Sequence, residues 1–209
     1  FLRANLPKAL PVVLLNSAVS GPAFHVLNID NHGGAVAMVR HLLQAGHRSV
    51  ALIAGPPGNF DASERERGYR EAMAKHAPRA ALTVVAGDFT EESGYRAGHE
   101  LLARARRPRA VFAANDMMAV GCLAAFKDAG VRVPEDIALA GFDDIPIARY
   151  VTPALTTVRV RIADFGRLAL ERLADVVEHP GQESPSADTP GFEIVVRDTC
   201  GGTRPEENS

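Results

Sequence analysis

The sequence is poor in the features that mark several classes of protein. Among its 209 residues only Cys122 and Cys200 are cysteines, which are too few for a disulfide framework and lack any metal-binding spacing. No apolar run approaches the length of a membrane span. The net charge of -2 gives no general attraction to nucleic acid or to an anionic membrane. These absences favour a soluble protein of a reducing compartment, which we expect to be the cytoplasm.

The signatures of common enzyme classes are also missing. The sequence has no G-x-G-x-x-G, no Walker A lysine loop, no G-x-S-x-G and no H-E-x-x-H. The piece Gly55-Pro56-Pro57-Gly58 is a poor phosphate cradle, because its prolines lack amide donors. The seven histidines do not cluster, and no nucleophile–base pair is evident. We therefore expect no catalytic residue, no metal and no cofactor.

The first residues only faintly imitate a signal peptide. Arg3 and Lys8 lie beside the apolar run 9–15, but Pro7 and Pro11 interrupt it and no Met precedes it. The last four residues of this run are more typical of a buried strand. The missing Met leads us to expect that the sequence begins inside a longer gene product.

Between Asn31 and Asp144 short apolar runs alternate with amphipathic segments. The runs predict strands at 50–54, 82–86, 111–114 and 137–140. Helices are predicted from Asn31 to Gly46, from a Ser63-x-x-Glu66 capping box, from Thr90 to about Arg104, and from Asp116 to Gly130. Further on we expect a strand at 158–162, a helix at 164–177, a loop rich in Pro, Gly and Ser at 180–190, a strand at 192–196 and a frayed tail from Gly201. This alternation predicts an α/β fold whose parallel sheet is covered by helices on both faces.

The unusual residues lie in the loops that follow the predicted strands. These loops are 55–62, 87–89, 115–116 and 141–144. Because crossovers between parallel strands are right-handed, the carboxyl ends of the strands meet at one edge of the sheet, where open α/β sheets bind ligands. The sequence therefore predicts a ligand site at this edge.

Arg65 is predicted in the first turn of its helix, where a cation opposes the helix macrodipole. Its planar fork suits paired hydrogen bonds to sugar hydroxyls or to a carboxylate at the sheet edge. It equally suits a surface ion pair with Glu64 or Glu66, which would contribute little. Position alone leaves the two interpretations open.

Further residues suit the same site. Asn115 and Asp116 can both cap a helix, so one of them is free to face a ligand, and an Asn side chain offers a donor and an acceptor. Asp143, followed by Asp144, fits turn chemistry, or a strand-end carboxylate that accepts two vicinal hydroxyls. Phe89 fits either the core or a flat wall on which the apolar face of a sugar stacks.

Eight short pieces then occur in order along the chain. They are Gly46-His47-Arg48, Ala54-Gly55-Pro56, Arg65-x-x-Gly68-Tyr69, Gly87-Asp88-Phe89, Asn115-Asp116-x-x-Ala119-x-Gly121, Val133-Pro134-x-Asp136-Ile137, Gly141-Phe142-Asp143-Asp144 and Pro153-x-Leu155-Thr156-Thr157-Val158. Through them the sequence resembles the lactose/galactose repressor (LacI/GalR) family of bacterial transcription regulators over roughly residues 11–201. The last piece is the most telling, because periplasmic sugar-binding relatives share the Asn-Asp and Gly-Phe-Asp pieces and usually lack it.

The resemblance implies a periplasmic-binding-protein-like type I fold, in which two Rossmann-like lobes hold an effector in the cleft between them. By match to the family motifs, Arg65, Asn115 and Asp143 would contact the effector. Phe89 would stack on it, and Asp61 would contribute from the loop before the helix. Family members typically form homodimers, and effector binding changes lobe closure and the spacing of the paired DNA-binding heads.

The resemblance also sets the expected domains. Residues 1–30 and 159–186 would be a remnant of the N-terminal lobe, residues 31–158 and 187–202 the C-terminal Rossmann-like lobe, and residues 203–209 a tail. The helix-turn-helix domain and the first strands of the N-terminal lobe, which family members have, are not in this sequence. We therefore expect contact with operator DNA only through that missing domain, and weak effector binding or none by this sequence alone.

Three functional hypotheses follow. The first is the effector-sensing region of a sugar-responsive transcription regulator that works as a homodimer. The alternative is a periplasmic sugar-binding receptor of the same fold. An α/β enzyme that uses Asp143 and Arg65 is the third, and the lack of a nucleophile–base pair argues against it. The same frame accommodates sugars, sugar acids, purines and nucleosides, and the sequence leaves inducer or co-repressor action open.

Overall fold

The chain divides into two compact units. The computed structural model describes residues 10–19, 24–179 and 191–201. Unit 1 comprises Phe1–Asp30 and Arg161–Gly191, and unit 2 comprises Asn31–Val160 and Phe192–Ser209. The loop predicted at 180–190 and all of the predicted tail after Gly201 lie outside the described residues.

Unit 1 contains a small parallel sheet and one long helix. The strands β1 (Val13–Leu15) and β2 (His25–Leu27) pair with each other, and α6 (Ile162–Glu178) contacts β1. The end of the first apolar run is thus a strand, as predicted, while β2 was not predicted from the sequence. Phe165 is the buried residue of α6.

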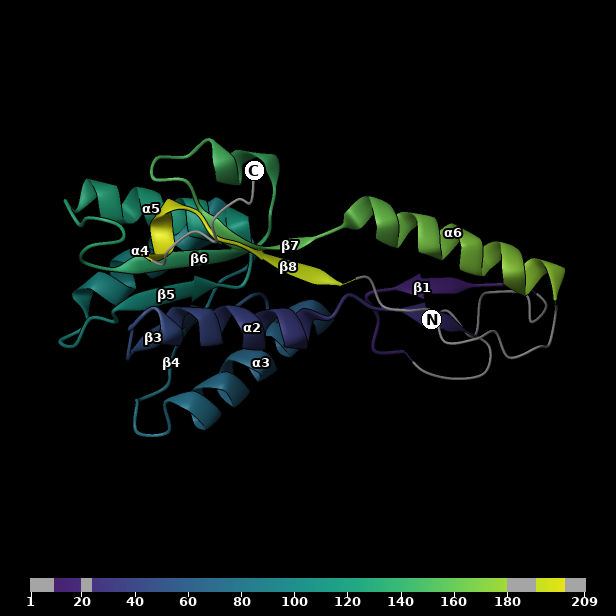
Figure 1. Ribbon diagram of the computed structural model, residues 1–209, viewed down its shortest axis with the longest axis horizontal. Coiled ribbons are helices and arrows are strands. Elements are labelled where there is room, and N and C mark those ends of the chain that lie inside the picture. Colours follow the sequence, from purple (N-terminus) through teal and green to yellow (C-terminus); the bar gives the residue numbers. More distant parts are fainter. Residues whose placement is uncertain (1–9, 20–23, 180–190, 202–209) are drawn as a thin grey trace, which may run out of the picture. The chain divides into compact units, whose positions relative to one another are not determined.

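Unit 2 is built on a six-stranded sheet with the order β4-β3-β5-β6-β7-β8 (Figure 1). Its strands are β3 (Val50–Ile53), β4 (Thr83–Val85), β5 (Ala110–Ala113), β6 (Ala138–Asp143), β7 (Thr156–Val160) and β8 (Phe192–Val195). The first five run parallel, and β8 pairs antiparallel with β7 at the edge. The predicted α/β fold is confirmed, with one antiparallel strand added.

Two helix pairs cover the faces of this sheet. One pair is α2 (Asn31–Gln44) with α3 (Phe60–His76), and the other is α4 (Glu91–Ala103) with α5 (Asp116–Asp128), packed on the opposite face (Figure 1). Because helices lie on both faces, β3 and β5 are buried along their whole length. This burial explains why these strands are continuous apolar runs without alternation.

Three local predictions were wrong. Helix α3 begins three residues before the predicted capping box, because the Asn59 side chain caps it by accepting from the Ala62 N–H at 2.9 Å. The Ser63 hydroxyl instead donates to the Asn59 carbonyl. Asn115 rather than Asp116 caps α5. Strand β6 continues through Asp143, so most of the predicted loop 141–144 is strand.

The strand order creates a switch point at the carboxyl edge of the sheet. The chain passes from β3 through α3 to β4, and then returns through α4 to β5 on the other side of β3. The crevice outside the carboxyl ends of β3 and β5 is where such sheets bind ligands. Two short 3-10 turns, η1 (Pro146–Arg149) and η2 (Asp198–Cys200), precede β7 and follow β8 in the sequence.

Candidate functional site

Arg65 lies at this switch point and is nearly buried. Its residue exposure is 5%, and it belongs to the second turn of α3 rather than the first. Its Nε donates to Asn31 Oδ1 at 2.8 Å, its Nη1 donates to the Ala114 carbonyl at 2.5 Å, and its Nη2 lies 3.2 Å from Asp143 Oδ1. These contacts use three of its five N–H groups.

The surface ion pair considered for Arg65 does not form. The carboxylates of Glu64 and Glu66 pair instead with the exposed side chains of Arg67 and Arg70. Arg65 points the other way because it lies on the buried face of α3, in line with Ala62 and Tyr69.

Two aromatic rings flank the Arg65 guanidinium. Its central carbon lies 3.8 Å from the centroid of the buried Phe142 ring and 5.9 Å from that of Phe89. Such cation–π contacts hold a guanidinium in place. Burial lowers the pKa of Arg65 from its ordinary value, and the charges of Asp143 and Asp61 oppose that change. The group still carries its charge at neutral pH, since arginine is not deprotonated in proteins.

Asp143 presents its carboxylate at the end of β6. Its side chain is 33% exposed, so one face is accessible while Oδ1 contacts Arg65. Burial raises the pKa of Asp143, the Arg65 charge lowers it, and the charge of Asp61 raises it further. Its φ of 113° is unusual for a residue with a side chain, and such strained positions cluster at ligand-binding and catalytic sites.

Phe89 is half-buried, and its ring packs at a fixed place against the backbone. Its φ is 71°, and its ring lies against Gly55, where an added Cβ would overlap the ring. Only glycine at position 55 leaves room for this ring. Phe89 is therefore neither a core residue nor a free surface ring, and part of it remains accessible.

Asn115 is the cap of α5 and also holds the Phe89 loop. Its Oδ1 accepts from the Met118 N–H at 2.9 Å, and its Nδ2 donates to the Phe89 carbonyl at 3.0 Å. These two bonds leave one amide N–H and one oxygen lone pair of the side chain. The helix predicted from Asp116 is thus capped by Asn115, and Asp116 is the residue not used for capping.

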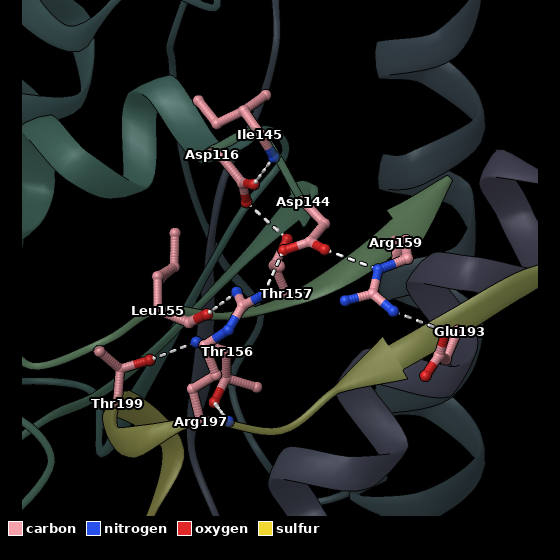
Figure 2. Close-up of polar contacts among 10 residues, drawn as sticks. All are labelled: Asp116, Asp144, Ile145, Leu155, Thr156, Thr157, Arg159, Glu193, Arg197 and Thr199. Carbon is pink, nitrogen blue, oxygen red and sulfur yellow. Dashed lines mark hydrogen bonds and ion pairs between the residues drawn. The ribbon is translucent and has the colours of Figure 1, made fainter. Parts of the chain in front are cut away.

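Asp116 is fully buried behind this edge. Its Oδ1 accepts from the Thr157 hydroxyl at 2.5 Å and its Oδ2 from the Ile145 N–H at 2.9 Å (Figure 2). Burial raises the pKa of Asp116 to about 7, although both hydrogen bonds lower it, and the nearby charges of Asp143 and Asp144 raise it further.

Asp144 ties the last three strands together. Its Oδ2 accepts from Arg159 Nε at 2.7 Å and its Oδ1 lies 2.5 Å from Arg197 Nη2, while Arg159 also reaches Glu193 at 3.0 Å (Figure 2). Arg197 in turn donates to the Leu155 carbonyl. With both oxygens engaged and 3% of its side chain exposed, Asp144 serves the framework under the site.

Asp61 and Asn31 complete the group. Asp61 lies in the first turn of α3, within the helix rather than the loop before it, and its Oδ1 accepts from Asn31 Nδ2 at 2.9 Å. Burial raises the pKa of Asp61, while the Arg65 charge and the Asn31 hydrogen bond lower it. From the sequence Asn31 was predicted only as the start of a helix, because no local pattern points from it to Arg65, which is 34 residues away.

The five predicted site residues thus lie on one edge of unit 2. They are linked by the contacts of Arg65 with Asp143 and Phe89, of Asn115 with Phe89, and of Asn31 with Arg65 and Asp61. The edge offers donors, acceptors and an aromatic ring, which together suit a polyhydroxylated ligand. Within the described ranges no three His, Cys, Asp or Glu side chains are grouped to hold a metal ion. None of the helices described has the length and apolar character to cross a membrane.

Comparisons with known proteins place this geometry in context. The model of the periplasmic binding protein-like domain family matches residues 39–200. The HTH-type transcriptional repressor PurR of Klebsiella pneumoniae (strain 342) is 37% identical over 182 residues, which are 86% of this chain and 53% of PurR. The chain spans about half the length of the curated relatives it matches.

Solved structures agree with this match. A sugar-binding transcriptional regulator of the LacI family from Escherichia coli, complexed with phosphate, has 31% identity and a TM-score of 0.81, with 90% of this chain and 68% of that chain covered. A LacI-family regulator from Enterococcus faecium with bound ribose has 27% identity and a TM-score of 0.81, with 90% and 70% covered.

Proposed function

This chain belongs to the LacI/GalR family of regulators with a periplasmic-binding-protein-like domain, and from that premise we propose that it is the effector-sensing region of a bacterial DNA-binding transcriptional regulator. The effector that we propose is a sugar or a related polyhydroxylated small molecule. The relatives are named as transcriptional regulators, which favours this function over a periplasmic receptor and over an enzyme.

The observation that carries the proposal is the Arg65–Asp143 pair at the carboxyl edge of the sheet. A sugar hydroxyl can accept a hydrogen bond from one of the Arg65 N–H groups that the described contacts leave, and can donate to the accessible Asp143 carboxylate. Asn115 adds an N–H and a lone pair, and the exposed part of the Phe89 ring can stack on the apolar face of a pyranose or furanose. We propose Arg65, Asn115, Asp143, Phe89 and Asp61 as the effector-binding residues.

The charges at this edge favour an uncharged effector. One guanidinium faces two carboxylates, those of Asp143 and Asp61, so the group carries a net negative charge when both are ionised. A sugar acid would meet this charge at close range, and like charges repel by about 1 kcal/mol at 4 Å even in bulk water. The E. coli relative was solved with phosphate, so an anion is the natural comparison in a binding test.

The wider function follows from the family. We propose that effector occupancy biases a two-state equilibrium of a cytoplasmic homodimer, and that operator DNA is bound through a domain outside this sequence. We propose no catalytic role, no bound metal and no cofactor. A periplasmic sugar-binding receptor is the alternative, and it is less favoured because the relatives are named as transcriptional regulators.

Calorimetry on the complete gene product tests the site. The ligands are D-ribose and D-glucose, with D-gluconate as the anionic match of glucose. We expect a neutral sugar to bind, gluconate to bind more weakly, and Arg65→Ala and Asp143→Ala each to weaken binding at least about tenfold, since each removes hydrogen bonds to a charged group. Arg67→Ala, an exposed arginine on the same helix, is the matched control and should leave affinity unchanged.

Two results would contradict this assignment. Unchanged affinity in both Arg65→Ala and Asp143→Ala would place the effector elsewhere, and tighter binding of gluconate than of glucose would refute the charge argument. Circular dichroism and operator binding measured on the same proteins separate a lost site from a lost fold.

A further inference from the structure

Asn31 is an almost fully buried polar residue that contacts Arg65. It is the first residue of α2 and is 1% exposed. It faces Arg65 and Asp61, which lie about one helix turn apart on α3. This buried carboxamide therefore contacts two of the proposed effector-binding residues at once.

The chemistry of the three side chains permits only one orientation of the Asn31 amide. Arginine has N–H donors and no acceptor, so Asn31 must turn its oxygen toward Arg65 Nε, as it does at 2.8 Å. Its nitrogen then faces Asp61 Oδ1 at 2.9 Å and donates to it. The carboxylate accepts this bond through one oxygen and keeps the other for a ligand. One amide therefore fixes the orientation of both a donor group and an acceptor group.

The packing of α2 on α3 keeps Asn31 at this place. Gly68 of α3 lies so close to α2 that an added Cβ would be 2.5 Å from the His32 carbonyl oxygen and 2.9 Å from the Ala35 Cβ. The residue that follows Asn31 is thus held against α3 by backbone contact. This close contact fixes the backbone of Asn31, whose side chain bonds to Arg65 and Asp61.

Building on the proposed function, we infer that Asn31 is a positioning residue of the effector site, which locks the Arg65 fork and the Asp61 carboxylate in the orientation that binds the effector. It acts through these two side chains and is not itself proposed to contact the effector. Removal of the Asn31 side chain should make both the Arg65 and the Asp61 side chains more mobile. A substitution that only weakens α3 should not have this effect.

The first experiment observes the Arg65 guanidinium and the Asp61 carboxylate in the absence of any ligand. Nuclear magnetic resonance of the 209-residue chain would follow hydrogen exchange at Arg65 Nε–H and the titration of the Asp61 carboxylate. In Asn31→Ala we expect exchange at Arg65 Nε–H to become at least about tenfold faster and the pKa of Asp61 to rise, since the Asn31 hydrogen bond lowers it. Asn31→Asp keeps an acceptor for Arg65, so it should preserve the slow exchange while still raising the pKa of Asp61.

Asn59→Ala is the matched control. Asn59 caps the same helix through the Ala62 N–H, so its loss weakens α3 without removing a described hydrogen bond of the Arg65 or Asp61 side chain. It should lower the unfolding temperature and leave the Arg65 exchange rate and the Asp61 pKa unchanged. If Asn31→Ala leaves both of these quantities unchanged, or if Asn59→Ala shifts them equally, the positioning role is refuted.

The second experiment measures binding of D-ribose and D-glucose to the same variants of the complete gene product over a range of pH. Asn31→Ala should weaken binding at least about tenfold and move the acid limb of the affinity profile to higher pH, because Asp61 then ionises later. Asn59→Ala should do neither. Wild-type affinity in Asn31→Ala overturns the inference. If the wild-type protein binds neither sugar, the proposed effector class fails, and the resonance experiment still decides the role of Asn31.

Discussion

Replacing Asp144 by asparagine tests the buried ion network that joins β6, β7 and β8 (Figure 2). Asparagine is the suitable substitution because Asp144 has a φ of 56°, a conformation that asparagine tolerates well and alanine does not. The change keeps the size of the side chain and one oxygen, and it removes the charge.

The expected loss follows from the burial of the partners. The asparagine side chain would offer one acceptor oxygen where Asp144 serves two arginines, at 2.7 Å from Arg159 and 2.5 Å from Arg197. The Arg197 side chain is only 12% exposed, so water cannot readily replace the lost charge, whereas Arg159 is 35% exposed and can be solvated. Leaving a buried charge without its partner costs about 3–5 kcal/mol. Allowing for the remaining oxygen and for the solvation of Arg159, we expect the free energy of unfolding to fall by about 2–4 kcal/mol.

Urea denaturation followed by circular dichroism measures this loss. Glu193→Gln is the matched control, because Glu193 contacts the same Arg159 but is 50% exposed, and a surface pair of this kind contributes about 0–1 kcal/mol. At about 2–4 °C per kcal/mol for a chain of this size, Asp144→Asn should melt roughly 4–16 °C below the wild type. If both variants lose equally little, the network is not the buried framework that the contacts indicate.

Three further changes test other parts of the account. Gly94→Ala places a Cβ in overlap with the Met118 carbonyl oxygen and should destabilise by about 2 kcal/mol or more despite better helix propensity, while Gly166→Ala, with nothing within 4 Å, should stabilise by up to about 1 kcal/mol in the same melting assay. Asn59→Ala should lower the free energy of unfolding, measured by urea denaturation, by about 1 kcal/mol, and Ser63→Ala should lower it clearly less. A larger loss in Ser63→Ala would show that Ser63, as first predicted, is the cap. Because the pKa of Asp116 is about 7 in the folded protein, above its ordinary 3.8, the folded state holds a proton that the unfolded state has lost, so stability should fall as pH rises from about 4 to about 7. Asp116→Asn should flatten that dependence, and an unchanged pH profile of the unfolding free energy would show that Asp116 is not its source.

Much of the fold could be predicted because its signals are local. Strands β3 and β5 are short apolar runs bounded by polar or glycine residues, and Thr90 caps α4 as its position suggests. The parallel order of the strands then brings their carboxyl ends to one edge, which is why the ligand edge could be foreseen without coordinates. Strand β2 was missed, since it has only three residues and no distinctive pattern.

The details of the site depend on contacts that no local pattern encodes. Arg65 is buried because it lies on the inward face of α3 and because Asn31 and Ala114 supply acceptors from distant parts of the chain. Asp144 looks like a turn residue, and only the pairing of β7 with β8 brings Arg159 and Arg197 to it. Sequence reasoning could name the residue types at the edge, and not which of them are already committed to neighbours.

The central claim is that the effector binds at the edge formed by Arg65, Asp143 and Phe89. The most direct test is to titrate D-ribose and D-glucose into the isotope-labelled complete gene product and to map the backbone amide shifts. We predict saturable changes at Phe89, Asn115 and Asp143, which vanish in Asp143→Ala. The opposite edge of the sheet is marked by Arg48, which precedes β3, and Arg79, which precedes β4. Saturable changes confined to that edge, with the three predicted amides unmoved, would contradict the claim.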